Sequence, residues 1–401
     1  MPGLPPDGAP APADGALPEH ALSALSKAPF AIYLHVPFCA ARCGYCDFNT
    51  YVLSAFGPDA LTAYLSAVRR ELDLAARVLG KVPKVTTVYF GGGTPSMLPV
   101  GEQAALLDAI RQRFPLAKNA EITTEANPES VSPMGLDMLA MAGFNRISFG
   151  MQSAVPKTLA TLERNHTVGR VFEAVEWARK AGFRSVSLDL IYGTPGEAES
   201  DWRASVETAL SMKPDHISAY SLTVEPGTRL AGRVASGELD APDEDTLADY
   251  YTLADGLFDS VGLHPYEISN WARRGHQAKH NLVYWHSGNW WGIGPGAHSH
   301  VGGVRWWNLR HPRDYAQALE AGRSPAQARE ELTPEQTHLE RVMLGLRLAE
   351  GLAMGELTPA ERKRVPELKK HGFAVVDADR LRLTLSGRLL ADAIARDLVS
   401  V

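Results

Sequence analysis

All three cysteines of this 401-residue chain lie close together, at Cys39, Cys43 and Cys46. Thiolates are soft ligands, and iron–sulfur clusters are held in proteins by cysteine thiolates. Three thiolates can hold three irons of a cubane cluster and leave the fourth iron without a protein ligand. An iron with an open position can bind a second molecule and do chemistry on it. The spacing C-x3-C-x2-C therefore points to a [4Fe-4S] cluster with one open iron.

Two other uses of the cysteines compete with this interpretation. A disulfide would leave one thiol over, and an odd cysteine count does not suggest a disulfide framework. Structural zinc usually takes four ligands, so a zinc site would need His35 beside the three cysteines. The zinc site stays open at the level of the sequence. A cluster fits a reducing compartment, since its thiols must not oxidise.

The composition is that of an ordinary globular protein, with 45% hydrophobic residues and a net charge of −6. This charge gives no reason to expect nucleic acid, and no apolar run is long enough to cross a bilayer. Residues 1–28 are rich in Pro, Gly and Ala and are expected to form a disordered tail. They lack arginine, a basic n-region and an apolar h-region, so no secretory signal or mitochondrial transit peptide is expected. The expected location is the cytoplasm.

From residue 31 onward, short β-rich runs alternate with helical patterns. The expected strands are 31–36, 85–90, 121–125, 146–149, 185–191 and 216–223. The expected helices include 58–79, 102–114, 132–142, 168–181 and 199–212. Strands that alternate with helices in this way argue for a parallel α/β architecture. The fold class is therefore expected to be α/β, with a partial (β/α)6 TIM-like barrel.

Polar and glycine-rich residues follow these strands, where the functional face of such a barrel lies. The cysteines follow the first strand, and the run Gly91-Gly92-Gly93-Thr94-Pro95 follows the second. Four more polar residues lie at or beyond the ends of later strands, namely Glu125, Gln152, Asp189 and Thr223. No lysine follows the glycines, so they are not a P-loop. They form either a tight turn or a backbone surface that approaches a ligand closely.

These motifs, in this order, resemble the radical S-adenosylmethionine (SAM) family. The strings HVPFCAARCGYCDF, GGGTPS, NPES, SFGMQS and DLIYGTPGE are similar to the branch that contains oxygen-independent coproporphyrinogen III oxidase and the haem chaperone HemW. The resemblance runs from about residue 30 to the C-terminus. It implies a [4Fe-4S] cluster on the three cysteines and SAM on the open iron. The further residues that it implies for binding cluster and SAM are Tyr33, Tyr45, Gly92, Gly93, Thr94, Glu125, Gln152, Arg164, Asp189 and Thr223.

Two departures from the oxidase make the chain most like HemW. The oxidase has a fourth cysteine two residues past the third, where this chain has Phe48. The oxidase also has an aromatic-rich N-terminal extension, which is a Pro/Ala tail here. The resemblance therefore implies a haem chaperone with no assigned catalytic residue, and whether the chain is also an enzyme stays open. The alternative is the oxidase itself, which uses SAM radical chemistry to decarboxylate coproporphyrinogen.

Histidine and tryptophan are concentrated in one later segment. Residues 264–311 hold seven of the 13 histidines, and residues 271–307 hold six of the eight tryptophans. Haem needs an axial ligand and a flat apolar surround, which imidazole and indole supply. The string His280-Asn281-Leu-Val-Tyr284-Trp285 matches HNxxYW, a HemW motif linked to haem, with His280 the first expected ligand and Tyr284 the second. The alternative is that His and Trp only pack a β-rich lid on the barrel.

The C-terminal segment is expected to be a separate module. Helical patterns at 335–350 and 357–371 precede a strand pair, 373–376 and 380–385, with Asp377 and Asp379 in the turn. The segment resembles a small winged-helix-like domain, but an acidic tip would repel phosphates. A packing or partner-docking role is expected, without nucleic acid.

The expected organisation has four parts: a disordered tail (1–28), the radical SAM barrel (29–230), an extension with the haem motif (231–332) and the C-terminal module (333–401). The expected partners are haem and haem-acceptor proteins, including respiratory ones, with membrane contact only through the acceptor. A homodimer is also considered.

Overall fold

Six parallel strands form the centre of the protein, as the sequence predicts. The computed structural model describes residues 8–25 and 28–399. In spatial order the six strands are β2 (Phe30–Val36), β5 (Val85–Gly92), β6 (Leu116–Ala126), β7 (Arg146–Gln152), β8 (Ser185–Tyr192) and β9 (His216–Ser221). Each pairs with its neighbour in parallel register. Within the described residues β9 does not pair back to β2, so the barrel is partial.

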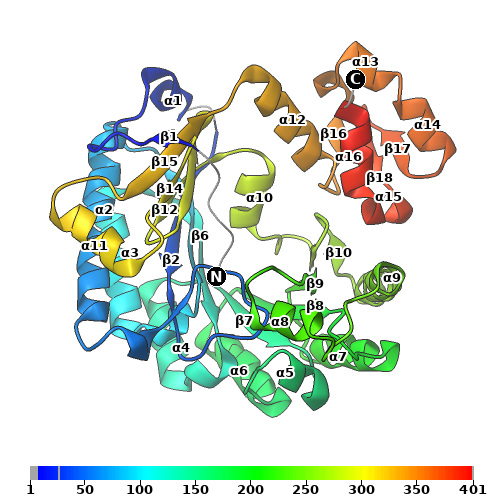
Figure 1. Ribbon diagram of the computed structural model, residues 1–401, viewed down its shortest axis with the longest axis horizontal. Coiled ribbons are helices and arrows are strands. Elements are labelled where there is room, and N and C mark those ends of the chain that lie inside the picture. The colour runs from blue at the N-terminus through cyan, green and yellow to red at the C-terminus, as the bar shows by residue number, and fades with distance from the viewer. Residues whose placement is uncertain (1–7, 26–27, 400–401) are drawn as a thin grey trace.

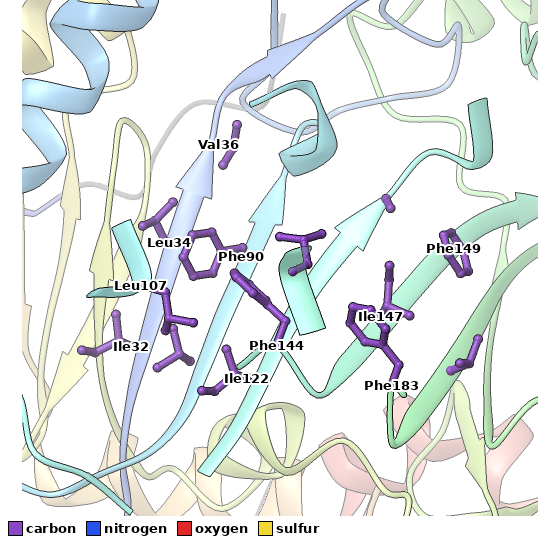
Figure 2. Close-up of a cluster of buried hydrophobic side chains, with 14 of the residues drawn as sticks. Ile32, Leu34, Val36, Phe90, Leu107, Ile122, Phe144, Ile147, Phe149 and Phe183 are labelled. Atoms are coloured by element: carbon purple, nitrogen blue, oxygen red, sulfur yellow. The ribbon is translucent and has the colours of Figure 1, made fainter. Parts of the chain in front are cut away.

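Helices cover the outer face of these strands. They are α2 (Ala60–Leu79), α3 (Val100–Arg113), α4 (Pro133–Ala142), α5 (Pro156–Thr161), α6 (Val168–Ala181) and α7 (Glu199–Ser211). Alternate residues of each strand, such as Leu34, Phe90 and Ile147, pack against the helices in one buried apolar cluster (Figure 2). Because side chains alternate along a strand, the residues between them, such as Tyr33 and Tyr89, point into the barrel.

Local capping signals set several helix ends. The hydroxyl of Ser132 accepts a hydrogen bond from the Gly135 N–H at the start of α4, and Pro133 occupies the first turn. Gly143 ends α4 in the left-handed conformation, with φ 106°. A side-chain cap at the start and a left-handed glycine at the end are the usual boundaries of a helix.

Strand β9 is shorter than expected. It ends at Ser221, and Thr223 lies in the loop that follows. The Thr228 N–H donates to the Glu225 carbonyl, so the chain turns at Pro226 instead of extending the strand.

Residues 236–332 continue the barrel sheet on both edges. Strand β12 (Asn289–Ile293) pairs in parallel with β2, and β13 (His298–Val301), β14 (Val304–Asn308) and β15 (Ala326–Glu331) follow in antiparallel order. On the other edge, β11 (Asn270–Ala272) pairs with β9, and β10 (His264–Pro265) pairs with β11. The His- and Trp-rich strands therefore extend the sheet and do not form a separate lid.

Four helices accompany these later strands. They are α8 (Arg229–Ala235), α9 (Glu244–Ser260), α10 (Lys279–Trp285) and α11 (Pro312–Glu320). Helix α10 contacts the inward-facing rings of Tyr33 and Tyr89 through His280, so it lies inside the barrel.

The prediction of a disordered N-terminal tail is wrong for the residues that the structure describes there. Strand β1 (Ala9–Pro10) pairs with β15, and helix α1 (Glu19–Ala24) follows. Ala21 is fully buried, and it packs with Leu25 into the main core. Backbone pairing and apolar contacts thus order a segment whose composition suggested disorder. Residues 1–7 and 26–27 of the predicted tail lie outside the described residues.

The C-terminal segment has an apolar core of its own and lies to one side of the barrel (Figure 1). Its elements are α12 (Pro334–Gly345), β16 (Leu352–Ala353), α13 (Pro359–Arg362), α14 (Val365–Lys370), β17 (Ala374–Asp377), β18 (Arg380–Leu383), α15 (Leu385–Leu389) and α16 (Ala391–Val399). The predicted helix 357–371 is wrong as one element. It divides because Pro366, which has no N–H, can only occupy the first turn of a new helix.

The strand pair β17 and β18 turns through Ala378 and Asp379, both of which have positive φ. Arg388 joins this segment to the barrel extension through two hydrogen bonds to the Asp255 carboxylate, of 2.9 and 2.8 Å. In the part of the chain that the structure describes, no helix is long and apolar enough to span a bilayer.

Candidate functional site

The cysteine loop is fixed directly after β2. Strand β3 (Phe38–Cys39) pairs with β4 (Tyr51–Val52), and this pairing closes the loop that carries the other two cysteines. Cys39 is buried, whereas Cys43 and Cys46 are partly exposed. The Cys46 N–H donates to the Cys43 carbonyl over 3.3 Å. The three thiols are thus held on a short loop that two small strands anchor.

Polar groups surround the sulfur atoms. The Thr94 hydroxyl donates to Cys39 Sγ over 3.5 Å, and Arg164 Nη1 donates to Cys43 Sγ over 3.4 Å. Burial raises the pKa of Cys39 to about 11, and the Thr94 hydrogen bond partly offsets this effect. Iron binds thiolates, so binding would displace the thiol protons. Donors aimed at sulfur are the surroundings that cluster thiolates use.

The zinc alternative is not supported by the position of His35. Its Nε2 hydrogen-bonds the Asn49 carbonyl over 2.9 Å, and its Nδ1 hydrogen-bonds the Tyr33 hydroxyl over 3.0 Å. The fourth zinc ligand that the sequence would need is therefore engaged elsewhere.

The glycine run packs directly against the cysteine loop. The Gly93 N–H donates to the Val36 carbonyl over 2.8 Å, and the Thr94 N–H donates to the Phe38 carbonyl over 2.9 Å. A Cβ on Gly93 would lie 2.7 Å from the Phe38 oxygen and 3.1 Å from Cys39 Sγ. Only glycine allows this approach. The run is therefore more than a turn, because it forms one wall of the thiol site.

Two carboxylates lie deeper in the barrel. Glu125 accepts hydrogen bonds from the Tyr89 hydroxyl (2.7 Å) and the Gly92 N–H (3.2 Å). Burial raises the pKa of Glu125 to about 7, and these hydrogen bonds lower it only in part. Asp189 accepts from the Ser148 hydroxyl over 2.9 Å, and burial raises its pKa as well. A cationic group bound beside them would favour their charged forms.

A cavity of about 790 Å³, which we call the cluster cavity, joins these parts. It brings together nearly all residues that the sequence predicts for cluster and SAM. They are Cys39, Tyr45, Cys43, Cys46, Gly92, Gly93, Thr94, Glu125, Gln152, Arg164, Asp189 and Thr223. Tyr33 is the exception, since it lines a neighbouring cavity.

The side chains of the cluster cavity fit a [4Fe-4S] cluster and SAM. Cys39, Cys43 and Cys46 would hold three irons, and Gly92, Gly93 and Thr94 would lie beside the SAM amino-acid group. When bound, this pair of cofactors supplies one-electron chemistry at the sulfonium of SAM. Glu125 and Asp189 offer acceptors for the amino group and the ribose hydroxyls. Arg164 already donates to Cys43 and to the Gly150 carbonyl (3.1 Å), so it also positions the cluster loop.

A second cavity, of about 820 Å³, adjoins the first and is called the aromatic cavity here. The two share Asp47, Phe48, Gly92 and Glu125 in their linings. The aromatic cavity is further lined by side chains from the extension and from α12, including Tyr284, Trp290, His298, Trp307, Arg305 and Met343. Both cavities fall in the size range of small-molecule and cofactor sites.

The predicted haem motif does not converge on one cavity. Tyr284 lines the aromatic cavity and Asn281 lines the cluster cavity, whereas Trp285 lines neither of these two. His280 is 1% exposed, with Nδ1 bonded to the Thr87 hydroxyl (2.8 Å) and Nε2 bonded to the Tyr284 hydroxyl (2.7 Å). Both imidazole nitrogens are therefore used inside the protein. The prediction of His280 as the first axial ligand stays a prediction, and ligation through either nitrogen would require one of these hydrogen bonds to break.

Sequence reasoning counted Trp290, His298 and Trp307 among a cluster of residues but assigned none of them a role. Their types gave the available signal, and only the pairing of β12, β13 and β14 brings them to one cavity. No pattern in the sequence indicated that Met343 of α12 would line this cavity. Phe48, 61% exposed, was noted only as a missing cysteine, yet it lines both cavities.

Known proteins match both the sequence and the fold. A sequence model of the Radical SAM superfamily matches residues 33–209. The chain is 49% identical to the heme chaperone HemW of Mycobacterium tuberculosis (strain H37Rv), over 94% of this chain and 97% of that protein. It is 36% identical to HemW of Bacillus subtilis (strain 168), over 90% of this chain and 97% of that protein.

Among solved structures, coproporphyrinogen III oxidase (HemN) from Escherichia coli, a radical SAM enzyme, has a TM-score of 0.82 and 22% identity. The match covers 97% of this chain and 94% of that one. This structure supports the fold, and the sequence identities define the family within it. The chain belongs to the HemW family of radical SAM proteins.

Proposed function

We propose that this protein is a haem chaperone, which binds haem beside a [4Fe-4S] cluster with SAM and transfers the haem to acceptor proteins. The observation that carries the proposal is the aromatic cavity, which combines histidine, tryptophan and tyrosine side chains and shares a wall with the cluster cavity. The near full-length identity to proteins named heme chaperones supports it.

Haemin titration of the purified, anaerobically reconstituted protein tests the first half of this function. We expect a shifted Soret band at micromolar haemin, with about one haem per chain. Transfer is then tested by mixing the loaded protein with an apo-haem protein and following the spectrum of the acceptor. Absence of any Soret shift at micromolar haemin would end the proposal.

The residues of the HNxxYW motif support the haem site in this proposal without all touching haem. His280 hydrogen-bonds the Tyr284 hydroxyl, and Tyr284 lines the aromatic cavity. Asn281 faces the cluster cavity, where it would meet SAM. Trp285 ends the same helix and would support its position.

The likeness to the oxidase supports a shared fold and carries no further claim about decarboxylation. If the protein is a chaperone as proposed, an anaerobic assay with coproporphyrinogen should give no protoporphyrinogen above background. Product formation at a rate typical of enzymes would favour the oxidase reaction instead.

We further propose the partners, the location and the oligomeric state of the protein. The acceptors include respiratory haem proteins. The protein acts in the cytoplasm, and it contacts a membrane only through a membrane-bound acceptor. Residues 333–401 dock partners and not nucleic acid, and the chain forms a homodimer. The acidic turn at Asp377 and Asp379 supports the exclusion of DNA. Size-exclusion chromatography with light scattering, with and without reconstituted cluster, tests the dimer.

A further inference from the structure

The aromatic cavity offers an imidazole that the protein does not use. His298 begins β13, and its ring opens onto the cavity. The His298 side chain is exposed, and within the described residues its ring nitrogens make no hydrogen bond. The backbone is nevertheless fixed, because the Trp290 indole N–H donates to the His298 carbonyl over 2.9 Å. A rigid backbone with an uncommitted imidazole is the arrangement that an axial ligand needs.

The other histidines of this cavity are already committed. His35 uses both ring nitrogens, as described above. His300 hydrogen-bonds the Gly288 carbonyl over 2.7 Å through Nδ1, and its Nε2 accepts from the Gly303 N–H over 3.2 Å. His298 therefore differs from its neighbours in the one property that metal ligation requires.

The protonation state of His298 also suits a metal. Although the His298 side chain is exposed, the chain around it desolvates the imidazole in part and lowers its pKa, and the positive charges of Arg305 and Arg310 add smaller contributions in the same direction. The acidic side chain of Glu330 acts in the opposite sense. The neutral form, which has a lone pair for iron, is therefore favoured at neutral pH.

Indole rings line the space next to this imidazole. His298 stacks on Trp307, with ring centroids 5.9 Å apart and an interplanar angle of 27°. Trp307 is 2% exposed, and its buried indole N–H has no hydrogen-bond acceptor among the described residues. A buried donor without a partner is costly, and a ligand carboxylate or ring nitrogen would satisfy it. This unpaired N–H is a second sign, independent of His298, that a ligand enters here.

We propose that His298 supplies the axial nitrogen to the iron of haem bound in the aromatic cavity, with Trp290 and Trp307 against the porphyrin. This inference rests on the proposed chaperone function and replaces His280 as the ligand. Nothing is oxidised or reduced in this step, since one lone pair of His298 forms one bond to iron. Haem in this position would lie beside Phe48 and Glu125, the wall shared with the cluster cavity.

Haemin titration of the full-length chain, with and without cluster, tests His298→Ala against three other proteins. Wild type reports on the proposed function itself. His280→Gln retains a group that can hydrogen-bond the Tyr284 hydroxyl and tests His280 as the alternative ligand. His264→Ala removes an exposed histidine that pairs with Asp259 and lies outside both cavities. The readouts are the Soret band, the electron paramagnetic resonance signal of ferric haem and the affinity.

For His298→Ala we expect an affinity at least about tenfold weaker and loss of the nitrogen-ligated spectrum. Added free imidazole should restore that spectrum. His280→Gln and His264→Ala should keep the wild-type spectrum. If His298→Ala does not fold, His298→Gln, which lacks a ligating ring of the same geometry, takes its place. An unchanged spectrum and affinity in the His298 variant would overturn the inference while the chaperone function stands. Absence of haem binding in wild type would instead reject the function.

Discussion

The cluster cavity and the aromatic cavity share a wall, yet the chain builds them in different ways. The cluster cavity lies at the carboxyl ends of parallel strands, and contacts such as Thr94 to Cys39 join the loops that follow the neighbouring strands β5 and β2. The aromatic cavity is built by antiparallel strands of the extension and by α12, so residues such as His298 and Met343 meet there from separate parts of the chain. Residues of short motifs form the first cavity, and sheet pairing forms the second.

The polar groups of the two cavities differ as well. In the cluster cavity, donors point at sulfur, and Glu125 accepts two hydrogen bonds. In the aromatic cavity, the His298 ring and the Trp307 N–H have no hydrogen-bond partner among the described residues. The cluster cavity also has buried polar atoms without such a partner, namely Thr123 Oγ1, Arg164 Nε and His166 Nδ1. The two cavities therefore differ in that donors already point at the future ligands of one cofactor, whereas the aromatic cavity offers an imidazole and an indole N–H. Each variant below is expected to affect one cavity more than the other.

Cys43→Ser should have the largest effect, and only on the cluster cavity. Removing one of three thiolates should leave the reconstituted protein with little iron or labile sulfide, against about four irons per chain in wild type. Haemin binding should persist, because no cysteine lines the aromatic cavity. Iron and sulfide analysis after anaerobic reconstitution measures the first effect, and the Soret titration measures the second.

Thr50→Val is the control for Cys43→Ser. Its hydroxyl lies 3.8 Å from Cys46 Sγ, a weak contact, so it should retain most of its iron. Full iron content in Cys43→Ser, or stoichiometric zinc in wild type, would contradict the assignment of the cysteines.

Gly93→Ala should disturb the same cavity through the backbone. The new Cβ would lie 2.7 Å from the Phe38 oxygen and 2.9 Å from the Val36 oxygen, neither of which belongs to a flexible side chain. We expect a loss of about 1–3 kcal/mol in the free energy of unfolding and a lower yield of cluster. Chemical denaturation and iron analysis check both.

Gly101→Ala is the matched control, because a Cβ there meets nothing within 4 Å in helix α3. That variant should be neutral or more stable by up to about 1 kcal/mol. Equal behaviour of the two variants would show that close backbone approach is not what Gly93 provides.

The difference between the two cavities also explains how much of the molecule could be predicted from its sequence. The six strands, their order and the residues of the cluster cavity were predictable, because each motif is local and parallel strands bring their carboxyl ends to one edge. His298 could not be selected from among so many histidines. Its distinction is an unused ring nitrogen, which depends on hydrogen bonds made elsewhere by His280 and His300. The order of residues 8–25 was likewise hidden, since it depends on pairing with β15.

Glu125→Gln affects the shared wall and should change how stability depends on pH. Burial raises the pKa of Glu125 to about 7, so the folded protein holds a proton that the unfolded chain releases near pH 4.5. The stability from this proton is fully present below pH 4.5 and is lost as the pH rises towards 7. The wild type should therefore lose roughly 1–3 kcal/mol over this window, and Glu125→Gln should lose less.

Glu197→Gln is a matched control for Glu125→Gln. Burial raises the pKa of Glu197 to about 7 too, and its carboxylate accepts from the N–H groups of Gly193 and Thr194, outside both cavities. Both variants should flatten the pH dependence, but only Glu125→Gln should weaken SAM binding, measured by calorimetry on the reconstituted protein. Equal SAM affinity in all three proteins would remove Glu125 from the SAM site.

Tyr284→Phe should have the smallest effect and separates support from ligation within the aromatic cavity. The variant loses the 2.7 Å hydrogen bond to His280 Nε2 and leaves that buried nitrogen without a partner. The cost should be about 1–2 kcal/mol in the free energy of unfolding.

Tyr250→Phe, which loses a 2.9 Å hydrogen bond to the Glu197 carbonyl away from both cavities, should cost a similar amount. Because His298 is the proposed ligand, haem affinity in Tyr284→Phe should change by less than about threefold and the spectrum should keep its nitrogen-ligated form. A large loss of affinity in Tyr284→Phe but not in Tyr250→Phe would make the tyrosine oxygen the ligand and leave the aromatic cavity without a role for the His298 imidazole.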